Sequence, residues 1–411
     1  MKDRIADILN TAREFILDCD PEKIQLENIL NGKLGLALYA VYMSREEPDS
    51  PYLMKVATVL ESIFNEISEG TSDLTAQSSF ADGLPGLGYV LHLVMKEKIL
   101  GEEYQEQLAV INELAYGNAL KMLDAQSFDY FYGAIGLLFY LHATESYQYC
   151  EEIITKVHSY GVANNFFFYN NTDDSYTMGI NFGFAHGSGA IIAVMLSLYE
   201  SGIEREKTRD IILNTLEQLL QFRRSEIDVE RIKVLDTREN CFPSIFPYNI
   251  MTERPDLLIT PEDGNSTNLY HYSGRVGWCN SDLGMVYLLY KTGTDLSVEK
   301  YIHIAEEMCA ATMMRKNFAE TDIRDYYICH GTSGVAMLYK KIYDITNNPI
   351  HQQSYHFWIN ATTDYMEKEM KILSFSPDKL NLLTGWLGAL LVLYGYKESK
   401  ELKGWDKIFL V

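Results

Sequence analysis

Residues 186–196 read His-Gly-Ser-Gly-Ala-Ile-Ile-Ala-Val-Met-Leu, in which a pair of glycines is followed at once by an unbroken apolar run. Wound into a helix, such a run is apolar on every side, so it predicts a helix that is buried all round. Glycines directly ahead of a helix are typical of a tight turn or of a close approach between two backbone segments. The stretch therefore predicts a turn that leads into a core helix.

The same pattern recurs along the chain: a polar residue, a Gly or Ser, a few small residues, usually a second Gly, and an apolar helix. The seven copies begin at Asn31, Asp82, Tyr132, His186, Asn280, His330 and Thr384. The first Gly or Ser of successive copies are 51, 50, 54, 94, 50 and 54 residues apart. A period of ~50 residues accommodates two helices, so we predict a fold built from seven helical repeats.

The 94-residue interval exceeds one repeat by about 40 residues and indicates an insertion. The stretch from about 227 to 272 is polar, lacks helical periodicity and contains Pro243, Pro247, Pro255 and Pro261. We therefore predict a single domain over residues 1–411 with an irregular insertion at about 227–272.

Amphipathic helices are expected between the apolar ones. Residues 210–222, for example, place Ile212, Leu216, Leu219 and Leu220 on one face. Fully buried helices that alternate with half-buried ones indicate two concentric layers. We predict an all-α fold in which seven helical hairpins could close into an α/α toroid, and ring closure would remove the need for capping repeats. In such a toroid the glycine turns and the positive ends of the inner helix dipoles lie on one face. An open solenoid is the alternative, although its helices would rarely be so uniformly apolar.

Composition narrows the class of protein. The chain has 35 basic and 57 acidic residues, a net charge of -22, which argues against nucleic acid as a partner. The longest apolar stretches, 189–199 and 385–396, are shorter than the ~18 to 20 residues that span a bilayer. Residues 1–18 carry charges of both signs, unlike a secretory signal. We expect a soluble, cytoplasmic protein that is not transmembrane, whose six cysteines are free thiols or metal ligands.

Two cysteines and a histidine occupy related places in the repeats. Cys279 and Cys329 each lie two residues before the first Ser or Gly of their copies, and His330 follows Cys329. The two copies are adjacent, so these three side chains should converge. Two thiols and an imidazole match a zinc site with three protein ligands and an open fourth position. Inert packing is the usual role of a helical cysteine and fits Cys309 better. For His186, at the place equivalent to His330, a helix cap and a functional role stay open.

Three motifs together resemble those of the lanthionine synthetase C-like cyclase family: Phe184-Ala185-His186-Gly187, Gly277-Trp278-Cys279 and Cys329-His330-Gly331. The resemblance covers nearly the whole chain and implies a double ring of seven inner and seven outer helices. It implies that Zn²⁺ is bound by Cys279, Cys329 and His330. It further implies that His186 is an acid or base candidate and that Asp129 and Arg275 belong to the site. Because all three fall on loops of the zinc face, we expect Asp129 to orient or pair with His186, and Arg275 to position groups or stabilise charge. By themselves, Asp129 and Arg275 would be interpreted as a helix cap and a surface charge.

The implied activity is zinc-dependent formation of lanthionine and methyllanthionine. Peptide cysteine thiols add to dehydroalanine or dehydrobutyrine in a ribosomally made precursor peptide. The metal would lower the pKa of the substrate thiol, and the enolate that forms would need charge stabilisation and then a proton. The expected partner is the dehydrated precursor peptide, with a dehydratase and an exporter as further candidates. The chain departs from the family at Asn280-Ser281, where Tyr-Gly or His-Gly is common, so substrate contacts there should differ.

Three alternatives remain. The same chemistry could add glutathione or another free thiol to a dehydrated peptide. A non-catalytic toroid could bind a peptide in its mouth. A carbohydrate-active toroid would need paired carboxylates, for which Asp82 and Asp129 are candidates, but it would leave the cysteines unexplained.

Overall fold

The structure is a computed structural model, and it describes residues 1–46, 50–170, 179–223, 241, 245–246, 275–372, 375–399 and 402–411. The insertion predicted at about 227–272 lies outside the described residues, apart from Cys241, Ile245 and Phe246. Helices dominate the described part of the chain. The strands described there are β1 (Ile180–Asn181) and β2 (Ile245–Phe246), which pair antiparallel.

One set of helices begins directly after the glycine motifs and forms the inner layer. These inner helices are α2 (Lys33–Ser44), α4 (Leu84–Lys96), α6 (Ala134–Ala143), α8 (Ser188–Glu200), α12 (Asp282–Asp295), α15 (Thr332–Thr346) and α17 (Trp386–Glu398). Every residue of α2 is buried, as the apolar run predicts. The inner helices are short, and in the described part of the chain no helix is long and apolar enough to cross a bilayer.

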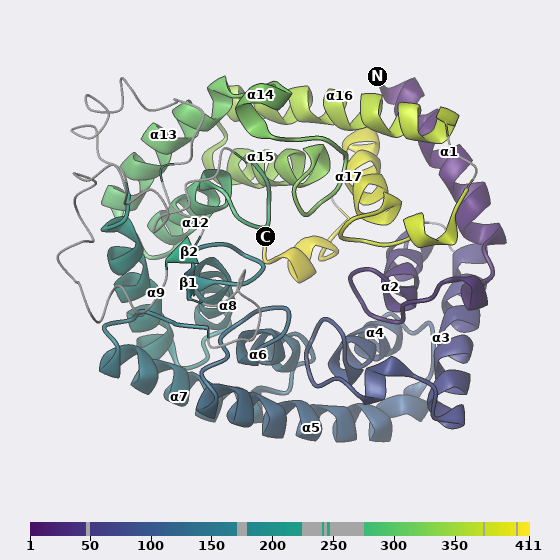
Figure 1. Cartoon of the computed structure of the whole chain (residues 1–411), viewed down its shortest axis with the longest axis horizontal. Coiled ribbons are helices and arrows are strands. Elements are labelled where there is room, and N and C mark those ends of the chain that lie inside the picture. Colours follow the sequence, from purple (N-terminus) through teal and green to yellow (C-terminus); the bar gives the residue numbers. More distant parts are fainter. Residues whose placement is uncertain are drawn as a thin grey trace, which may run out of the picture.

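A second set of helices packs around the first. The outer helices are α1 (Lys2–Asp18), α3 (Pro51–Glu69), α5 (Gln105–Asp124), α7 (Cys150–Ala163), α9 (Arg205–Leu220), α13 (Glu299–Met314) and α16 (Pro349–Ile372). In α9, Ile212, Leu216 and Leu219 are buried, as the amphipathic pattern predicts. Figure 1 shows the outer helices at the periphery and the inner ones around the centre, which confirms the all-α toroid. Its division into seven equal repeats stays a prediction.

The other helical elements in the described part of the chain are short. They are η1 (Pro21–Lys23), η2 (Asp73–Thr75), η3 (Glu102–Tyr104), η4 (Tyr147–Tyr149), α14 (Phe318–Thr321), η8 (Pro377–Lys379) and η9 (Asp406–Phe409). Ser50 caps α3 by accepting a hydrogen bond from the backbone N–H of Tyr52, and Pro51 occupies the first helical position, where no N–H is needed.

The ring is closed by contacts between the two ends of the chain. Helix α1 packs against α16 and α17. The carbonyl of Leu30 accepts hydrogen bonds from the backbone N–H groups of Leu382, at 2.9 Å, and Leu383, at 3.0 Å. These bonds join the loop before α2 to the loop before α17, which excludes the open solenoid.

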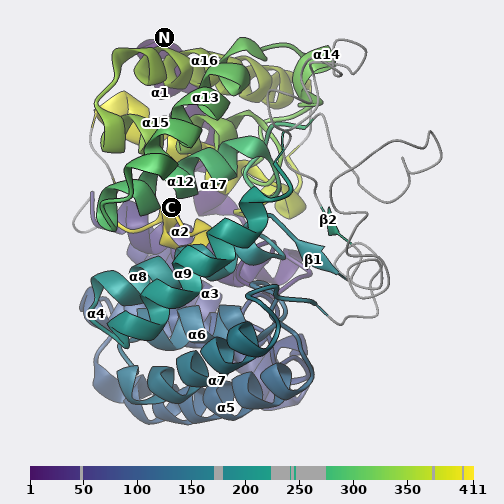
Figure 2. The ribbon, with the colours of Figure 1, turned by 90° about the vertical axis from the view of Figure 1, so that its left-hand side faces the viewer.

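Backbone hydrogen bonds also join most of the neighbouring loops that precede the inner helices, and we call this set of bonded loops the loop belt. Its bonds run from Ile29 N to Ala81 O (3.3 Å), Ala81 N to Phe131 O (3.1 Å), Phe184 N to Cys279 O (2.9 Å), Cys279 N to Cys329 O (2.9 Å), Cys329 N to Leu383 O (3.2 Å) and Leu383 N to Leu30 O (3.0 Å). The belt places these loops on one face of the ring. Figure 2 shows β1 and β2 to one side of the helices.

The C-terminal segment occupies the centre of the ring, where the C-terminus is marked in Figure 1. Ile408 and Phe409 are fully buried. The hydroxyl of Tyr130 donates a hydrogen bond to the carbonyl of Ile408 at 2.8 Å, and the indole N–H of Trp278 donates to that of Phe409 at 2.7 Å. Residues 402–411 therefore fill the middle of the toroid and touch the residue next to Cys279.

Candidate metal centre and the adjoining histidine

Cys279, Cys329 and His330 come together at the loop belt. The hydrogen bond between the Cys279 N–H and the Cys329 carbonyl, 2.9 Å long, fixes the two cysteines side by side. The two sulfur atoms and a ring nitrogen of His330 all lie within 4.8 Å of one another, so this group could hold a metal ion. The convergence expected from the sequence arises because neighbouring copies are joined through their backbones at these positions.

The three side chains are electrostatically coupled. Hydrogen bonds from Cys329 and His330 hold the pKa of Cys279 well below its ordinary value, against the effect of burial. The same contact with Cys279, together with burial, raises the pKa of Cys329. The contact with Cys279 also raises the pKa of His330, which burial alone would lower. The arrangement thus favours a thiolate on Cys279 that is stabilised by a neighbouring thiol and imidazolium.

Trp278 supports the cluster from the interior. It is fully buried, and its ring stacks on that of Phe184 with an interplanar angle of 9°. The edge of Trp278 meets the ring of Phe409, with centroids 5.4 Å apart. Cys279 is therefore anchored through its neighbour to the C-terminal segment.

His186 pairs with Asp129 across two adjacent loops. Its Nδ1 lies 2.7 Å from Oδ2 of Asp129, while Oδ1 of the same carboxylate accepts a bond from the backbone N–H of Tyr132 at 2.9 Å. The Asp129 side chain is 1% exposed and that of His186 is 26% exposed. The backbone N–H groups of Phe184 and Ala185 donate to the Cys279 carbonyl, at 2.9 and 3.3 Å, which brings the His186 loop against the metal group.

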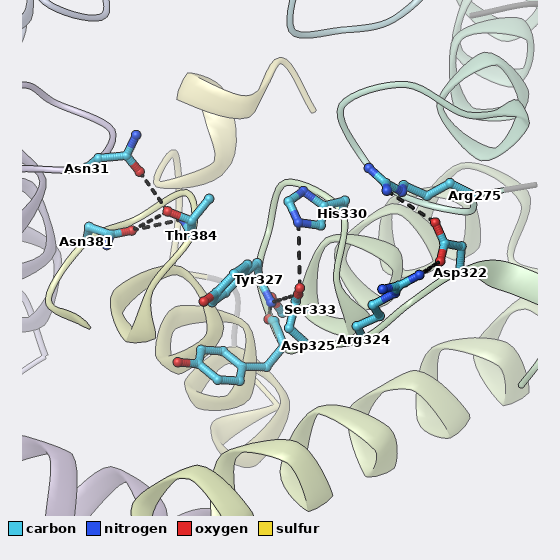
Figure 3. A network of polar contacts seen from close by, with 11 residues as sticks. Asn31, Arg275, Asp322, Arg324, Asp325, Tyr327, His330, Ser333, Asn381 and Thr384 are labelled. Carbon is cyan, nitrogen blue, oxygen red and sulfur yellow. Dashed lines mark hydrogen bonds and ion pairs between the residues drawn. The ribbon is translucent and has the colours of Figure 1, made fainter. Parts of the chain in front are cut away.

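Arg275 lies on the same loop as Cys279, and its side chain forms an ion pair with Asp322. Its guanidinium lies 3.2 Å from Oδ2 of Asp322, and its side chain is 41% exposed. Figure 3 shows Asp322 between Arg275 and Arg324. The positive charge of Arg275 is among the influences that lower the pKa of Cys279. Its effect on the cluster is therefore electrostatic.

Other residues of the site were not expected from the sequence. Tyr132 is 49% exposed and its ring stacks on His186, with centroids 5.7 Å apart. The buried Asn170 donates to the His186 carbonyl at 2.5 Å and accepts from the Phe128 N–H at 2.9 Å. At Gly183, a Cβ would lie 2.2 Å from the Cys279 carbonyl. The sequence contains one signal for Gly183. Four residues before the first glycine of a copy, four other copies carry Asn, Asp or Ser, whereas this copy carries Gly183.

The departure at Ser281 leaves the backbone at this position extended. Ser281 precedes α12 with φ -167° and ψ 167°, and Gly187 precedes α8 with φ -145° and ψ -162°. Both conformations are extended, which a residue with a side chain adopts freely. The replacement of glycine by Ser281 therefore requires no unusual backbone conformation. The Ser281 hydroxyl donates to the Gly277 carbonyl at 2.5 Å, so the added side chain bonds within its own loop.

Comparison with known proteins supports the fold and shows the family of the chain. The structure resembles a solved structure of nisin cyclase with a TM-score of 0.73 and 18% sequence identity, and the match covers 100% of this chain and 97% of that chain. No curated protein matches the chain. Residues 24–410 match the family model described as lanthionine synthetase C-like protein. With this match over nearly its whole length, the chain belongs to the lanthionine synthetase C-like family.

Proposed function

We propose that the protein is a zinc-dependent cyclase that forms lanthionine and methyllanthionine in a dehydrated, ribosomally made precursor peptide. The observation that carries the proposal is the convergence of Cys279, Cys329 and His330 beside the Asp129–His186 pair. Two sulfur atoms and one imidazole are ligands that zinc prefers, and three protein ligands leave a position for substrate. The lowered pKa of Cys279 favours the deprotonated form that a metal requires.

A zinc ion held by these three residues would bind the substrate cysteine as a thiolate and orient it. The addition moves one proton from the thiol sulfur to the α-carbon of the dehydrated residue. We assign the transfer of that proton to His186, because its loop is hydrogen-bonded to the carbonyl of Cys279. Asp129 accepts the Nδ1–H of His186, which leaves Nε2 to take the thiol proton and later deliver it to the α-carbon.

The charges of Asp129 and Arg275 act on different steps. The buried carboxylate of Asp129 stabilises the imidazolium that forms when His186 takes a proton. Arg275 contributes positive charge near the two cysteines and would stabilise the negative charge that develops during addition. The substrate also requires an enzyme that dehydrates Ser or Thr before this step, so a dehydratase is a proposed partner, and an exporter would act on the product.

The test combines zinc content with a cyclisation assay. A synthetic peptide that contains one cysteine and one dehydroalanine is incubated with protein, and loss of the free thiol at constant mass reports ring formation. The wild type should contain about one zinc per chain and form the ring, because three protein ligands suffice to retain the ion. Cys329→Ala should lose both zinc and activity. The matched control is Cys309→Ala, a buried cysteine of the outer helix α13, which should keep both.

Other outcomes separate the alternatives. Addition of glutathione to the peptide in place of ring closure would favour the alternative in which the protein adds a free thiol to a dehydrated peptide. A folded, reduced wild type that contains no zinc and binds the peptide without changing it would contradict the proposal and leave a peptide-binding toroid.

A further inference from the structure

The imidazole of His330 faces a carboxylate in addition to the two cysteines. Its Nε2 lies 3.6 Å from Oδ2 of Asp325, as Figure 3 shows. The two side chains are 31% and 22% exposed, so water screens this pair only in part. The separation is within ion-pair reach and a few tenths of an ångström longer than a hydrogen bond. With Nε2 directed at the carboxylate, Nδ1 is the ring nitrogen available to a metal.

Asp325 is itself held in place by the loop that carries Cys329 and His330. Its Oδ1 accepts a hydrogen bond from the backbone N–H of Tyr327 at 2.9 Å, and its carbonyl accepts one from Thr332 at 3.0 Å. At Gly331, a Cβ would lie 2.2 Å from Oδ1 of Asp325, so only a glycine leaves room for the carboxylate here. One oxygen is thus fixed to the backbone, and the other is presented to the imidazole.

We infer that Asp325 is a positioning residue of the metal centre, which accepts the Nε2–H of His330 and so fixes the ring with Nδ1 toward the zinc. A metal-bound histidine generally donates its second N–H to a carboxylate or carbonyl, which sets the tautomer and strengthens the ligand. The inference rests on the proposed function, since it requires a zinc ion on Cys279, Cys329 and His330. It adds to that function a residue that the family motifs do not contain.

The same loop offers a matched control. Asp322 lies three residues before Asp325, and its carboxylate binds Arg275 at 3.2 Å and Arg324 at 3.0 Å. Figure 3 shows Asp322 bonded to these two arginines and not to His330. Asp322→Asn therefore removes one negative charge from the same loop and leaves the contact between Asp325 and His330 in place.

The experiment measures zinc affinity by competition with a chromogenic chelator, and the absorption of the cobalt-substituted protein. Asp325→Asn and Asp325→Ser both keep a side-chain oxygen for the Tyr327 N–H, and neither keeps a charged acceptor for His330. Both variants should bind zinc roughly 10 to 100 times more weakly than the wild type. Their cobalt d–d bands should shift, because His330 is no longer held in one orientation. Asp322→Asn should match the wild type in affinity and spectrum.

Each possible result supports or contradicts one of the two proposals. Unchanged zinc affinity in either Asp325 variant would overturn the inference and leave the proposed function intact. A wild type that binds neither zinc nor cobalt would overturn the proposed function itself. Thermal unfolding of the metal-free proteins separates folding from metal binding. If metal-free Asp325→Asn unfolds well below the wild type and Asp325→Ser binds zinc normally, Asp325 stabilises the loop and does not position His330.

Discussion

Asp129 illustrates how a loop contact acquires a chemical role. In several copies, the side chain four residues before the first glycine accepts a hydrogen bond from the N–H just before that glycine. These side chains are Asn28, Ser79, Asp129 and Asn381. In the first copy the other end of Asn28 binds Asp82 of the next loop, at 2.9 Å, just as Asp129 binds His186. The Asp129–His186 pair is therefore a charged form of a contact that also ties adjacent loops together.

This equivalence predicts the effect of Asp129→Asn. The amide oxygen can keep the bond to the Tyr132 N–H, so zinc content and thermal stability should stay near those of the wild type. The rate of cyclisation should fall by roughly 10² to 10⁴, because the charge that supports the imidazolium is lost. Steady-state kinetics and thermal unfolding measure the two effects. The matched control is Asp82→Asn, in the equivalent contact with Asn28, which should cyclise normally. Equal activity of Asp129→Asn and the wild type would remove Asp129 from the mechanism.

A single glycine sets the spacing between the His186 loop and the metal group. In Gly183→Ala, the new Cβ would lie 2.2 Å from the Cys279 carbonyl, so the two loops must separate. We expect a loss of about 1 to 3 kcal/mol in the free energy of unfolding, measured with urea, and weaker zinc binding. Gly117→Ala, within α5 and with nothing inside 4 Å of the new Cβ, should instead be neutral or slightly stabilising. Full stability of Gly183→Ala would contradict this account of the loop contact.

At the scale of the helix, the sequence predicts where the inner helices begin but leaves the reason for the glycines open. In the structure, these glycines allow neighbouring backbone segments to approach closely. Positive-φ glycines in the described part of the chain are Gly70, Gly179, Gly202 and Gly404, which are not the residues that precede inner helices. At Gly187, which precedes α8, a Cβ would overlap the Asn181 carbonyl oxygen, at a distance of 2.1 Å. The sequence therefore indicates which positions are crowded, but it does not indicate which atoms lie against them.

Other parts of the site could not be predicted for a physical reason. The loop belt joins backbone groups 50 or more residues apart, and a backbone hydrogen bond leaves no signature in the pattern of side chains. Asp325 and Tyr132 acquire their contacts only when the loops are folded, so they look like ordinary loop residues in the sequence. Cys279, Cys329 and His330 were found because their chemistry is rare and their places in the repeats coincide.

Helix α6 carries a histidine that should make stability depend on pH. Burial and the positive charge of Lys407 lower the pKa of His142 to about 4, from an ordinary value of 6.5. Above pH 6.5 the ring is neutral in the folded and the unfolded chain. As pH falls from about 6.5 toward 4, the unfolded chain takes up a proton that the folded chain does not, so stability falls. Urea unfolding across this range should show a shallower decline for His142→Gln. Parallel curves for variant and wild type would contradict this role of His142.

At the scale of the whole molecule, closure of the ring gives every inner helix a neighbouring inner helix on both sides. An open array of repeats can fray from its ends, whereas this ring joins α1 to α17. We therefore expect helix content and tryptophan fluorescence to report one coincident unfolding transition. Ile5→Ala, at a fully buried position of α1, should lower the unfolding free energy by about 2 to 5 kcal/mol and shift both signals together. Val110→Ala, 58% exposed on α5, should shift neither. A separate early transition in Ile5→Ala would show that the closing contact unfolds on its own.

The bonds from Leu382 and Leu383 to the Leu30 carbonyl also have a consequence for synthesis. While the ribosome is still making the chain, the finished helices can assemble only into an arc. The flank formed by α1 and α2 stays uncovered until α17 has left the exit tunnel. At about 5 to 20 residues per second, the more than 350 residues between Leu30 and Leu382 take tens of seconds to translate. Throughout that time the nascent protein exposes the apolar surface of α1 and α2. A chaperone that covers such a surface should therefore raise the yield of folded protein more for this chain than for one whose first helices are covered early.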